Sequence, residues 1–438
     1  MKRARCAFLV MVMSLSAGAG FAENLSDVPV PAGTGGDAAL STAGYEQRVR
    51  QLENEHGVYH PQLGEALLSL GLAYRAQNKY PQAMAAIERA LQIQRVNTGL
   101  YDLGQTRIVE LIIECASAYR DWDKVGDRLH YLLWVYRRNY QDNKKILLPE
   151  LEKVEQFIFD VYRSGMDNMP LNSLVEADDV NSEAIAILED LKQSEEERIN
   201  ALYRTAVINY HIADAVTSPR VSHREIRAAM LESNRPIPYV DELEVRDYFF
   251  LQSFFKGKRA IDEVIDIYKK ELPGSAAKYA EALVFLGDWY LVFDQKRNAM
   301  PRYEDAYAVL VENHIPELKI KALLGEPKPL KTLLFPGEKI QAAGPDTLYV
   351  DAVLDVPGNG WPTNIKIIKT NPANEEKLRR RGKLAIAGVR YRPRFENGKP
   401  VDTKNVTFQY VFDIQDANGV YLEQGGENAF FLKDVIDK

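Results

Sequence analysis

The chain has 438 residues, of which 46% are hydrophobic and 27% are charged, and its formal net charge is −7. This length exceeds the roughly 100 to 200 residues of an ordinary single domain, so we expect two structural units or an extended array with an added module. The apolar content argues against a largely disordered chain, and the acidic balance argues against nucleic acid as a partner.

The N-terminus has the three parts of a secretory signal. Residues 1–5 carry three basic side chains, residues 7–15 form an apolar run, and residues 20–22 read Gly-Phe-Ala. This order predicts a cleaved signal peptide at residues 1–22. The apolar run is shorter than the roughly 20 residues that a spanning helix needs, so we expect no stable membrane insertion after cleavage.

The start of the mature chain is expected to be flexible, because residues 23–44 are rich in Pro, Gly, Ser and Ala and lack hydrophobic periodicity. Cleavage would remove three basic groups and no acidic group, changing the formal charge from −7 to −10. Cys115 would then be the remaining cysteine. It lies between Ile113 and Ala116 on an apolar helix face, so we expect a buried small hydrophobe rather than a reactive thiol.

A repeating helical pattern begins at Tyr45. Two helices are predicted within residues 65–95, with a turn at 78–81 and with Gly71 and the alanines at 83 and 90 where the helices cross. Short side chains at crossings allow two helices to approach closely. A second, weaker copy is offset by 45 residues, with Arg128 and Val135 in place of the two alanines. A third copy covers residues 280–311.

This arrangement resembles the tetratricopeptide (TPR) repeat, and the segment Gly57-Val-Tyr-His-Pro61 resembles its longer kinesin light chain variant. The resemblance implies stacked helix pairs over residues 45–315, which would make an α-solenoid with a concave face. Residues 241–272 are predicted to form another pair with a turn at 256–258. Long loops are expected at 163–181 and 217–240.

A Pro-rich linker is predicted at residues 316–346, and the hydrophobic period changes to two after it. We expect strands at 348–354 and 365–368, a helix at 375–387, and strands at 389–395 and 406–414. The turn Asn418-Gly419 could add a further hairpin strand at 419–432.

This element order, together with Val389-Arg-Tyr-Arg-Pro-Arg-Phe-Glu-Asn-Gly-Lys-Pro-Val401, resembles the C-terminal domain of TonB energy transducers. The predicted fold is therefore mainly α, a TPR-like solenoid followed by a small α+β domain at 347–438. The resemblance implies a Gram-negative periplasm and addition of a partner's extended peptide as a strand. Its candidate binding residues are Arg390, Tyr391, Arg392, Pro393, Phe395, Asn397 and Gly398.

The TPR resemblance implies a second set of binding candidates, on the first helix of each pair where the concave face would lie. These are Glu65, Leu68, Leu72, Arg75, Glu110, Ile113, Ser117, Arg120, Glu281, Val284 and Asp288. Chaperone-binding relatives hold a terminal carboxylate with a Lys/Asn/Arg clamp, and this chain lacks that clamp. In the alternative interpretation, Arg75 and Arg120 pair with these glutamates or with neighbouring repeats.

No motif for catalysis or metal binding emerges. His56 and His60 are four residues apart, but Gly57 and Pro61 favour a loop there rather than a ligand pair on one helix. We therefore expect no enzyme activity, no cofactor and no metal. The expected function is a periplasmic scaffold that binds proteins. The alternative is an accessory component of a TonB-type outer-membrane uptake system.

Overall fold

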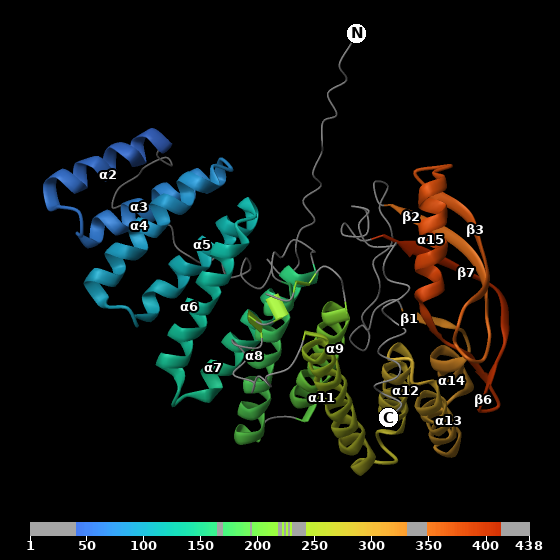
Figure 1. Cartoon of the computed structure of the whole chain (residues 1–438). Helices are drawn as coiled ribbons and strands as arrows, with labels where there is room; N and C mark the ends of the chain where they lie inside the picture. The colour runs from blue at the N-terminus through green and yellow to red at the C-terminus, as the bar shows by residue number, and fades with distance from the viewer. Residues whose placement is uncertain are drawn as a thin grey trace, which may run out of the picture. The chain divides into compact units, whose positions relative to one another are not determined.

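The structure is a computed structural model (Figure 1). It describes residues 41–163, 170–192, 195–217, 221–222, 225–226, 228–229, 242–330 and 348–412. Thirteen α-helices make up most of this described part, and small antiparallel sheets lie in its C-terminal portion, where α15 falls between two strands. The predicted fold class, an α-rich part followed by an α+β domain, is confirmed at this level. The expected signal segment at 1–22 and the expected strand at 419–432 lie outside the described residues.

The chain divides into two compact units, Met1–Asn168 and Met169–Lys438. The division falls within the predicted helical array of 45–315 and not at the predicted linker of 316–346. The last helices of the array belong to the same unit as the C-terminal sheet domain, and buried contacts between the two account for this.

Unit 1 is a run of helices in which each helix packs on the next one in the sequence. Its helices are α2 (Thr42–His56), α3 (Pro61–Ala76), α4 (Tyr80–Thr98), α5 (Thr106–Tyr119), α6 (Trp122–Tyr140) and α7 (Lys144–Arg163), with a short 3-10 turn at Leu103–Gln105. Gly57 and Gly99 end α2 and α4 with φ angles of 86° and 94°. Such angles favour glycine.

Helices that are two apart in the sequence lie side by side in unit 1. Ion pairs show this: Glu53–Arg89 joins α2 to α4 at 2.6 Å, Glu88–Lys124 joins α4 to α6 at 2.9 Å, and Arg75–Glu114 joins α3 to α5. One row therefore contains α2, α4 and α6, and another contains α3 and α5. This is repeat-like packing of helix pairs.

The predicted register of the second copy is wrong for its second helix. α6 begins at residue 122 and α4 at residue 80, an offset of 42 rather than 45. Val125 and Leu132 therefore correspond to the buried Ala83 and Ala90. The cause is that α5, with 14 residues, is shorter than α3, with 16.

Unit 2 begins with three long helices whose boundaries differ from the predicted ones. They are α8 (Pro170–Leu191), α9 (Glu195–Thr217) and α11 (Glu242–Lys270). α8 lies where a loop was expected at 163–181. α11 is one continuous helix and lacks the turn predicted at 256–258. Gly257 allows α11 to pack closely on α12, since a Cβ atom there would lie 2.2 Å from the indole ring of Trp289.

A buried polar cluster joins these three helices. The side chain of Asp178 on α8 is fully buried, and Lys256 on α11 forms an ion pair with it at 2.6 Å. Asn209 on α9 donates a hydrogen bond to the same carboxylate at 2.7 Å. Because a buried charge is costly unless it is paired, this cluster holds α8, α9 and α11 in one arrangement.

The third predicted helix pair is confirmed as α12 (Ala276–Val292) and α13 (Lys296–Glu312). A Cβ atom on Gly287 would lie 2.5 Å from the ring of Tyr303, so the glycine permits the close crossing that the sequence indicated. The first part of the predicted linker is not a linker. Residues Glu317–Leu324 form α14 and Lys328–Leu330 form strand β1. The part from residue 331 lies outside the described residues.

The C-terminal domain has a three-stranded antiparallel sheet with the strand order β3-β2-β7. Its strands are β2 (Tyr349–Val356), β3 (Thr363–Asn371) and β7 (Thr403–Val411), and helix α15 (Glu376–Gly388) packs on β2 and β3. Gly382 allows that approach, because a Cβ atom there would lie 2.5 Å from Val350. The strands predicted at 348–354, 365–368 and 406–414 and the helix predicted at 375–387 are confirmed as β2, β3, β7 and α15. The single strand predicted at 389–395 is wrong, because that segment forms two short strands outside this sheet.

Short strands connect this domain to the preceding helices. β1 pairs with β4 (Arg390–Arg392), and β5 (Arg394–Glu396) pairs with β6 (Lys399–Val401). Asn397 and Gly398 form the two-residue turn between β5 and β6, with φ angles of 49° and 76°. Two positive φ angles in a two-residue loop are typical of a tight hairpin.

Candidate functional site

The predicted concave residues of unit 1 lie on α3 and α5. Leu68, Leu72 and Arg75 fall on one face of α3 and are half-buried. Arg75 pairs with Glu114 of the neighbouring helix α5 and does not form a free cationic clamp. The structure therefore supports the alternative interpretation, in which this arginine pairs with a neighbouring repeat.

Glu110 and Glu114 on α5 complete a polar strip next to these leucines. Arg107 is 3.1 Å from Glu110 and 3.9 Å from Glu114, and the hydroxyl of Tyr136 on α6 donates to Glu110 at 3.3 Å. Two arginines thus face two glutamates. We call Leu68, Leu72, Arg75, Arg107, Glu110 and Glu114 the α3–α5 strip.

Burial changes the acidity of groups in this strip. Desolvation raises the pKa of Glu114 above its ordinary value, although Arg75 and Arg107 oppose that rise. Burial also raises the pKa of the neighbouring Cys115 thiol to about 11. Cys115 is fully buried and free, so the prediction of a buried hydrophobe is confirmed.

The other predicted residues of this face differ in accessibility. Glu65 and Arg120 are exposed, Ser117 is half-buried, and Ile113 is buried with 1% exposure. Ile113 therefore cannot contact a partner in this conformation. Arg120 ends α5 with a φ angle of 65°, which places it at a helix terminus rather than within the α3–α5 strip.

Asp288, predicted on the concave face, and Arg392, predicted on the tail, bind each other. Arg392 Nε donates to Asp288 Oδ1 at 2.8 Å, and Nη2 donates to Oδ2. The side chains of Arg392 and Asp288 are 6% and 5% exposed. Neither residue can therefore serve as an open binding residue, and Val284, 1% exposed, is closed to partners as well.

Further bonds close the cluster around this ion pair. The hydroxyl of Tyr303 donates to Asp288 at 2.8 Å, and Arg392 donates to the carbonyl of Leu323 at 2.9 Å. Burial, followed by the negative charge of Asp288, raises the pKa of Tyr303 well above its ordinary value, so the hydroxyl keeps its proton. We call this region, with Asp288, Tyr303, Phe395 and Arg392, the α12–β4 seam.

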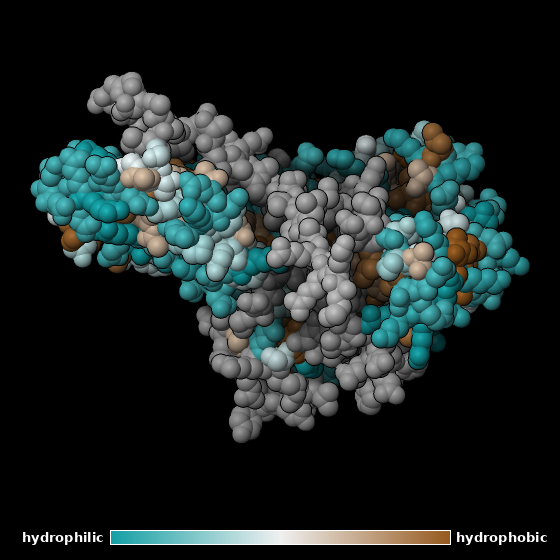
Figure 2. All heavy atoms as spheres, turned by 90° about the horizontal axis from the view of Figure 1, so that it is seen from above, coloured by the Kyte–Doolittle hydropathy of each residue, from teal (hydrophilic) through white to brown (hydrophobic). Residues whose placement is uncertain are grey.

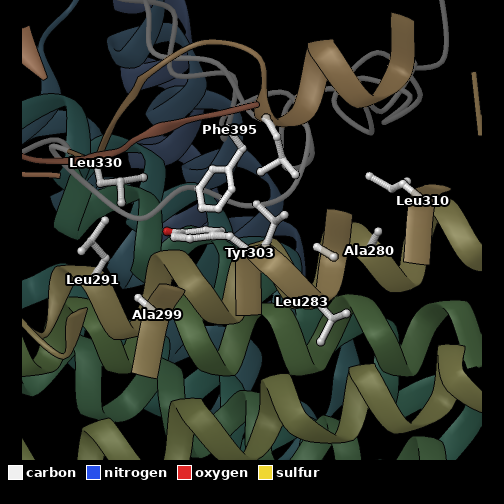
Figure 3. Close-up of a cluster of buried hydrophobic side chains, with 11 residues drawn as sticks. Ala280, Leu283, Leu291, Ala299, Tyr303, Leu310, Leu330 and Phe395 are labelled. Atoms are coloured by element: carbon white, nitrogen blue, oxygen red, sulfur yellow. The ribbon is translucent and has the colours of Figure 1, made fainter. Parts of the chain in front are cut away.

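The remaining tail candidates also lie in or beside the seam. Phe395 is buried and its ring contacts that of Tyr303 (Figure 3). Arg390 binds Asp294 with bonds of 2.5 and 3.2 Å and stacks on Trp361 at 3.4 Å. Tyr391 and Pro393 are buried.

The turn at Asn397 and Gly398 lies against α13. Gly398 lies next to the ring of Tyr307, and Lys399 forms an ion pair with Glu304 at 3.0 Å. The segment expected to receive a peptide from another protein is thus occupied by contacts with this protein's own helices.

Two partners in the seam were not found from the sequence. Asp294 follows the end of α12, and Trp361 lies in the β2–β3 connection. No local motif marks either residue. Their role in holding the tail becomes visible only in three dimensions, where Arg390 contacts both of them.

Strand addition to the tail would have to occur at the outer strands of the three-stranded sheet, β3 and β7. Among the described residues, β3 and β7 each pair with β2 alone. Ile368 on β3 has a 60% exposed side chain. Unpaired backbone groups on such edges can accept an additional strand.

A cavity of about 340 Å³ lies between α11, α12 and α13. Its lining includes Asp262, Asp266, Lys269, Tyr279 and Arg302. This volume is at the lower end of the range for small-molecule sites. The lining carries both acidic and basic groups, so it favours no one charge on a ligand.

The described residues contain no group of three or more His, Cys, Asp or Glu side chains placed to hold a metal ion. None of the helices in the part of the chain that the structure describes is both long and apolar enough to cross a membrane. No family model matches the chain, and no curated protein sequence matches it significantly. The TPR and TonB resemblances therefore rest on the residues quoted above.

Proposed function

We propose that the protein is an exported, TPR-like scaffold that binds another protein through the α3–α5 strip. One observation carries this proposal: half-buried leucines on α3 lie beside a strip of paired arginines and glutamates. An apolar centre with a polar surround is the usual composition of a protein-binding face. The basic, apolar and small-residue order of residues 1–22 supports export, and the tail's resemblance to TonB supports the periplasm.

The strip should select partners by hydrogen bonding more than by net charge. Arg75 and Arg107 are balanced by Glu110 and Glu114. A partner that offers both donors and acceptors can replace the water on these groups, whereas a purely acidic or basic partner meets repulsion from half of them.

The test is a charge placed in the apolar part of the strip. Leu72→Glu in the tagged full-length protein should abolish recovery of the partner after crosslinking in native cells. The matched control is Leu318→Glu on α14, where the side chain is already 80% exposed. Circular dichroism must show equal helicity for the two variants. Equal recovery of the same partner with both variants would contradict the proposal.

A second candidate function is an accessory role in a TonB-type outer-membrane uptake system. The position of β3 and β7 favours it, because in the described part of the chain each of them pairs with β2 alone and an extended receptor peptide could join the sheet beside them. A photo-crosslinking residue at Ile368 should then capture a receptor peptide. The same residue at Leu384 on α15, which is 53% exposed and not on an edge strand, should not.

A further inference from the structure

A continuous stack of aromatic rings and arginines lies on the surface of unit 1. Arg95 stacks on Tyr131 at 4.2 Å, and Tyr131 contacts Trp134 with ring centroids 5.8 Å apart. Trp134 contacts Tyr101 at 4.7 Å, and Arg138 lies over Tyr101 at 5.4 Å. We call these five residues the aromatic ladder. Its members come from α4, the α4–α5 connection and α6 rather than from α3 and α5.

Three of the five ladder residues are exposed although they are large, and Arg95 and Tyr131 are half-buried. Tyr101 and Trp134 are 48% and 42% exposed. Figure 2 shows the surface over the N-terminal helices as mainly teal with scattered pale and light brown areas. Tryptophan, tyrosine and arginine are the residue types most enriched at binding hot spots, because their contact area is large.

Hydrogen bonds hold the ladder in place. The hydroxyl of Tyr131 lies within hydrogen-bond distance of two acceptors, the carbonyl of Leu100 at 2.9 Å and Gln105 Oε1 at 2.5 Å. The amide of Asn139 donates to the carbonyl of Tyr101 at 2.7 Å. Rings fixed in advance lose little conformational freedom on binding, so this surface is prepared for a ligand.

The connection that carries Tyr101 occurs once more in the preceding repeat, with the same hydrogen bond but without the stacked rings. Residues 57–59 and 99–101 read Gly-Val-Tyr and Gly-Leu-Tyr, and Asn97 donates to the carbonyl of Tyr59 at 2.8 Å as Asn139 does to that of Tyr101. Four further apolar side chains in this region are about half exposed: Val58, Tyr59, Val96 and Leu100. A surface that repeats along the array suits an extended peptide segment.

The charges on the ladder indicate the chemistry of that peptide. Arg138 is exposed, and the contact that the structure gives it is the ring of Tyr101. Arg95 contacts Tyr131 and donates to Gln105, and neither arginine pairs with a carboxylate in the described part of the chain. A guanidinium stacked on a ring keeps its in-plane N–H donors, and these match a carboxylate. The nearest acidic neighbour in sequence, Asp102, accepts hydrogen bonds from Gln94 and Thr98.

We propose that the aromatic ladder, with the apolar side chains beside it, docks an extended peptide segment of a partner protein in which apolar residues alternate with carboxylates. The apolar residues pack on Tyr101 and Trp134, and the carboxylates bind Arg138 and Arg95. This site does not depend on the α3–α5 strip, so either surface can bind without the other.

The experiment measures the binding of labelled peptides to the full-length protein by fluorescence anisotropy. The probe is Asp-Phe-Asp-Leu-Asp-Phe-Asp, and the matched control carries Asn in place of every Asp. The acidic peptide should bind about tenfold more tightly or better, because each charged hydrogen bond contributes more than a neutral one. High salt should reduce this preference.

Two variants locate the site. Trp134→Ala and Arg138→Gln should each weaken binding of the acidic peptide by about tenfold, as expected for hot-spot residues. Arg138→Gln changes an exposed side chain, so its folding should not be affected. The controls are Tyr119→Ala, at a side chain 54% exposed, and Arg297→Gln, at an exposed arginine on α13; both should bind like the unchanged protein.

Several outcomes would overturn the proposal. The acidic peptide could fail to bind, or both peptides could bind equally well. The control variants could also weaken binding as much as Trp134→Ala and Arg138→Gln do. Two other results would assign the surface differently and also overturn it. In one, Trp134→Ala abolishes a dimer of the free protein. In the other, it abolishes binding to phosphatidylglycerol vesicles while peptide binding is unchanged.

Discussion

Removing the arginine of the α12–β4 seam should destabilise unit 2 strongly. In an Arg392→Met variant, the Asp288 carboxylate would stay buried and keep the Tyr303 hydroxyl as a donor, but it would lose both bonds from the guanidinium. Breaking a buried ion pair by removing one partner typically costs about 3 to 5 kcal/mol. The loss of the bond to the Leu323 carbonyl adds to this cost. We therefore expect the free energy of unfolding to fall by about 3 to 5 kcal/mol.

The assay is urea unfolding followed by circular dichroism, with hydrogen exchange to assign the transition to α12 and α13. A double variant, Arg392→Met with Asp288→Leu, supplies the control because it removes both charges. A buried pair replaced by apolar residues is often neutral in stability, so the double variant should recover most of the loss. A single variant that loses less than about 1 kcal/mol would refute the reasoning. So would a double variant less stable than the single one.

Three further predictions concern packing and ionisation. Gly287→Ala should lower the free energy of unfolding by about 1 to 3 kcal/mol, because the added Cβ would overlap a buried ring. Gly126→Ala, in a helix with open space around the residue, should raise that free energy by about 0.5 to 1 kcal/mol, because alanine favours a helix more than glycine does. Urea unfolding of both variants tests this, and equal effects would contradict it. In a Cys6→Ser background, Cys115 should react with a thiol reagent at pH 8 only after unfolding, since burial raises its pKa to about 11; fast reaction of the folded protein would exclude this. Burial raises the pKa of Glu88, but its hydrogen bonds to two basic side chains of α6 outweigh burial and leave the pKa below the ordinary value. Glu88 should therefore contribute about 1 kcal/mol to the free energy of unfolding above pH 4.5, and this contribution should disappear as the pH falls through the lowered pKa. Unfolding of the unchanged protein and of Glu88→Gln at several pH values tests this, and a difference in stability that persists in acid would count against it.

The sequence was most informative where one local rule decides the structure. Gly71 and Gly287 predicted close helix crossings, and both lie where a Cβ atom would meet a side chain of the facing helix. The period of two predicted β2 and β3 within a few residues.

The errors have a common cause, which is that one residue type serves different purposes in different tertiary surroundings. The segment Lys256-Gly257-Lys258 has the composition of a turn, but it lies in the middle of a helix, where Gly257 leaves room for the ring of Trp289. The prolines at 327 and 329 favour a linker, yet residues 328–330 form a strand because β4 pairs with them. Local pattern cannot show which distant element will pack at a position.

The candidate site shows the same limit more sharply. Asp288 and Arg392 were both selected as open binding residues, each from a separate resemblance. Charged residues at such positions look exposed in a sequence, because buried charges are rare unless they are paired. The two residues are 104 positions apart and satisfy each other. Sequence spacing gave no sign of that pairing, so exposure was the wrong inference for both.

The seam also determines how the binding functions can be separated experimentally. A truncation after Leu324 would remove Arg392 and Phe395 and leave Asp288 buried without its guanidinium partner. Loss of a partner from such a protein would report damage to α12 and α13 as well as the missing tail. Substitutions outside the seam avoid this, since the half-buried Leu72 and the exposed Trp134 and Ile368 lie on three surfaces that do not include it. A partner lost with one of these substitutions and kept with the other two therefore identifies the surface that binds it.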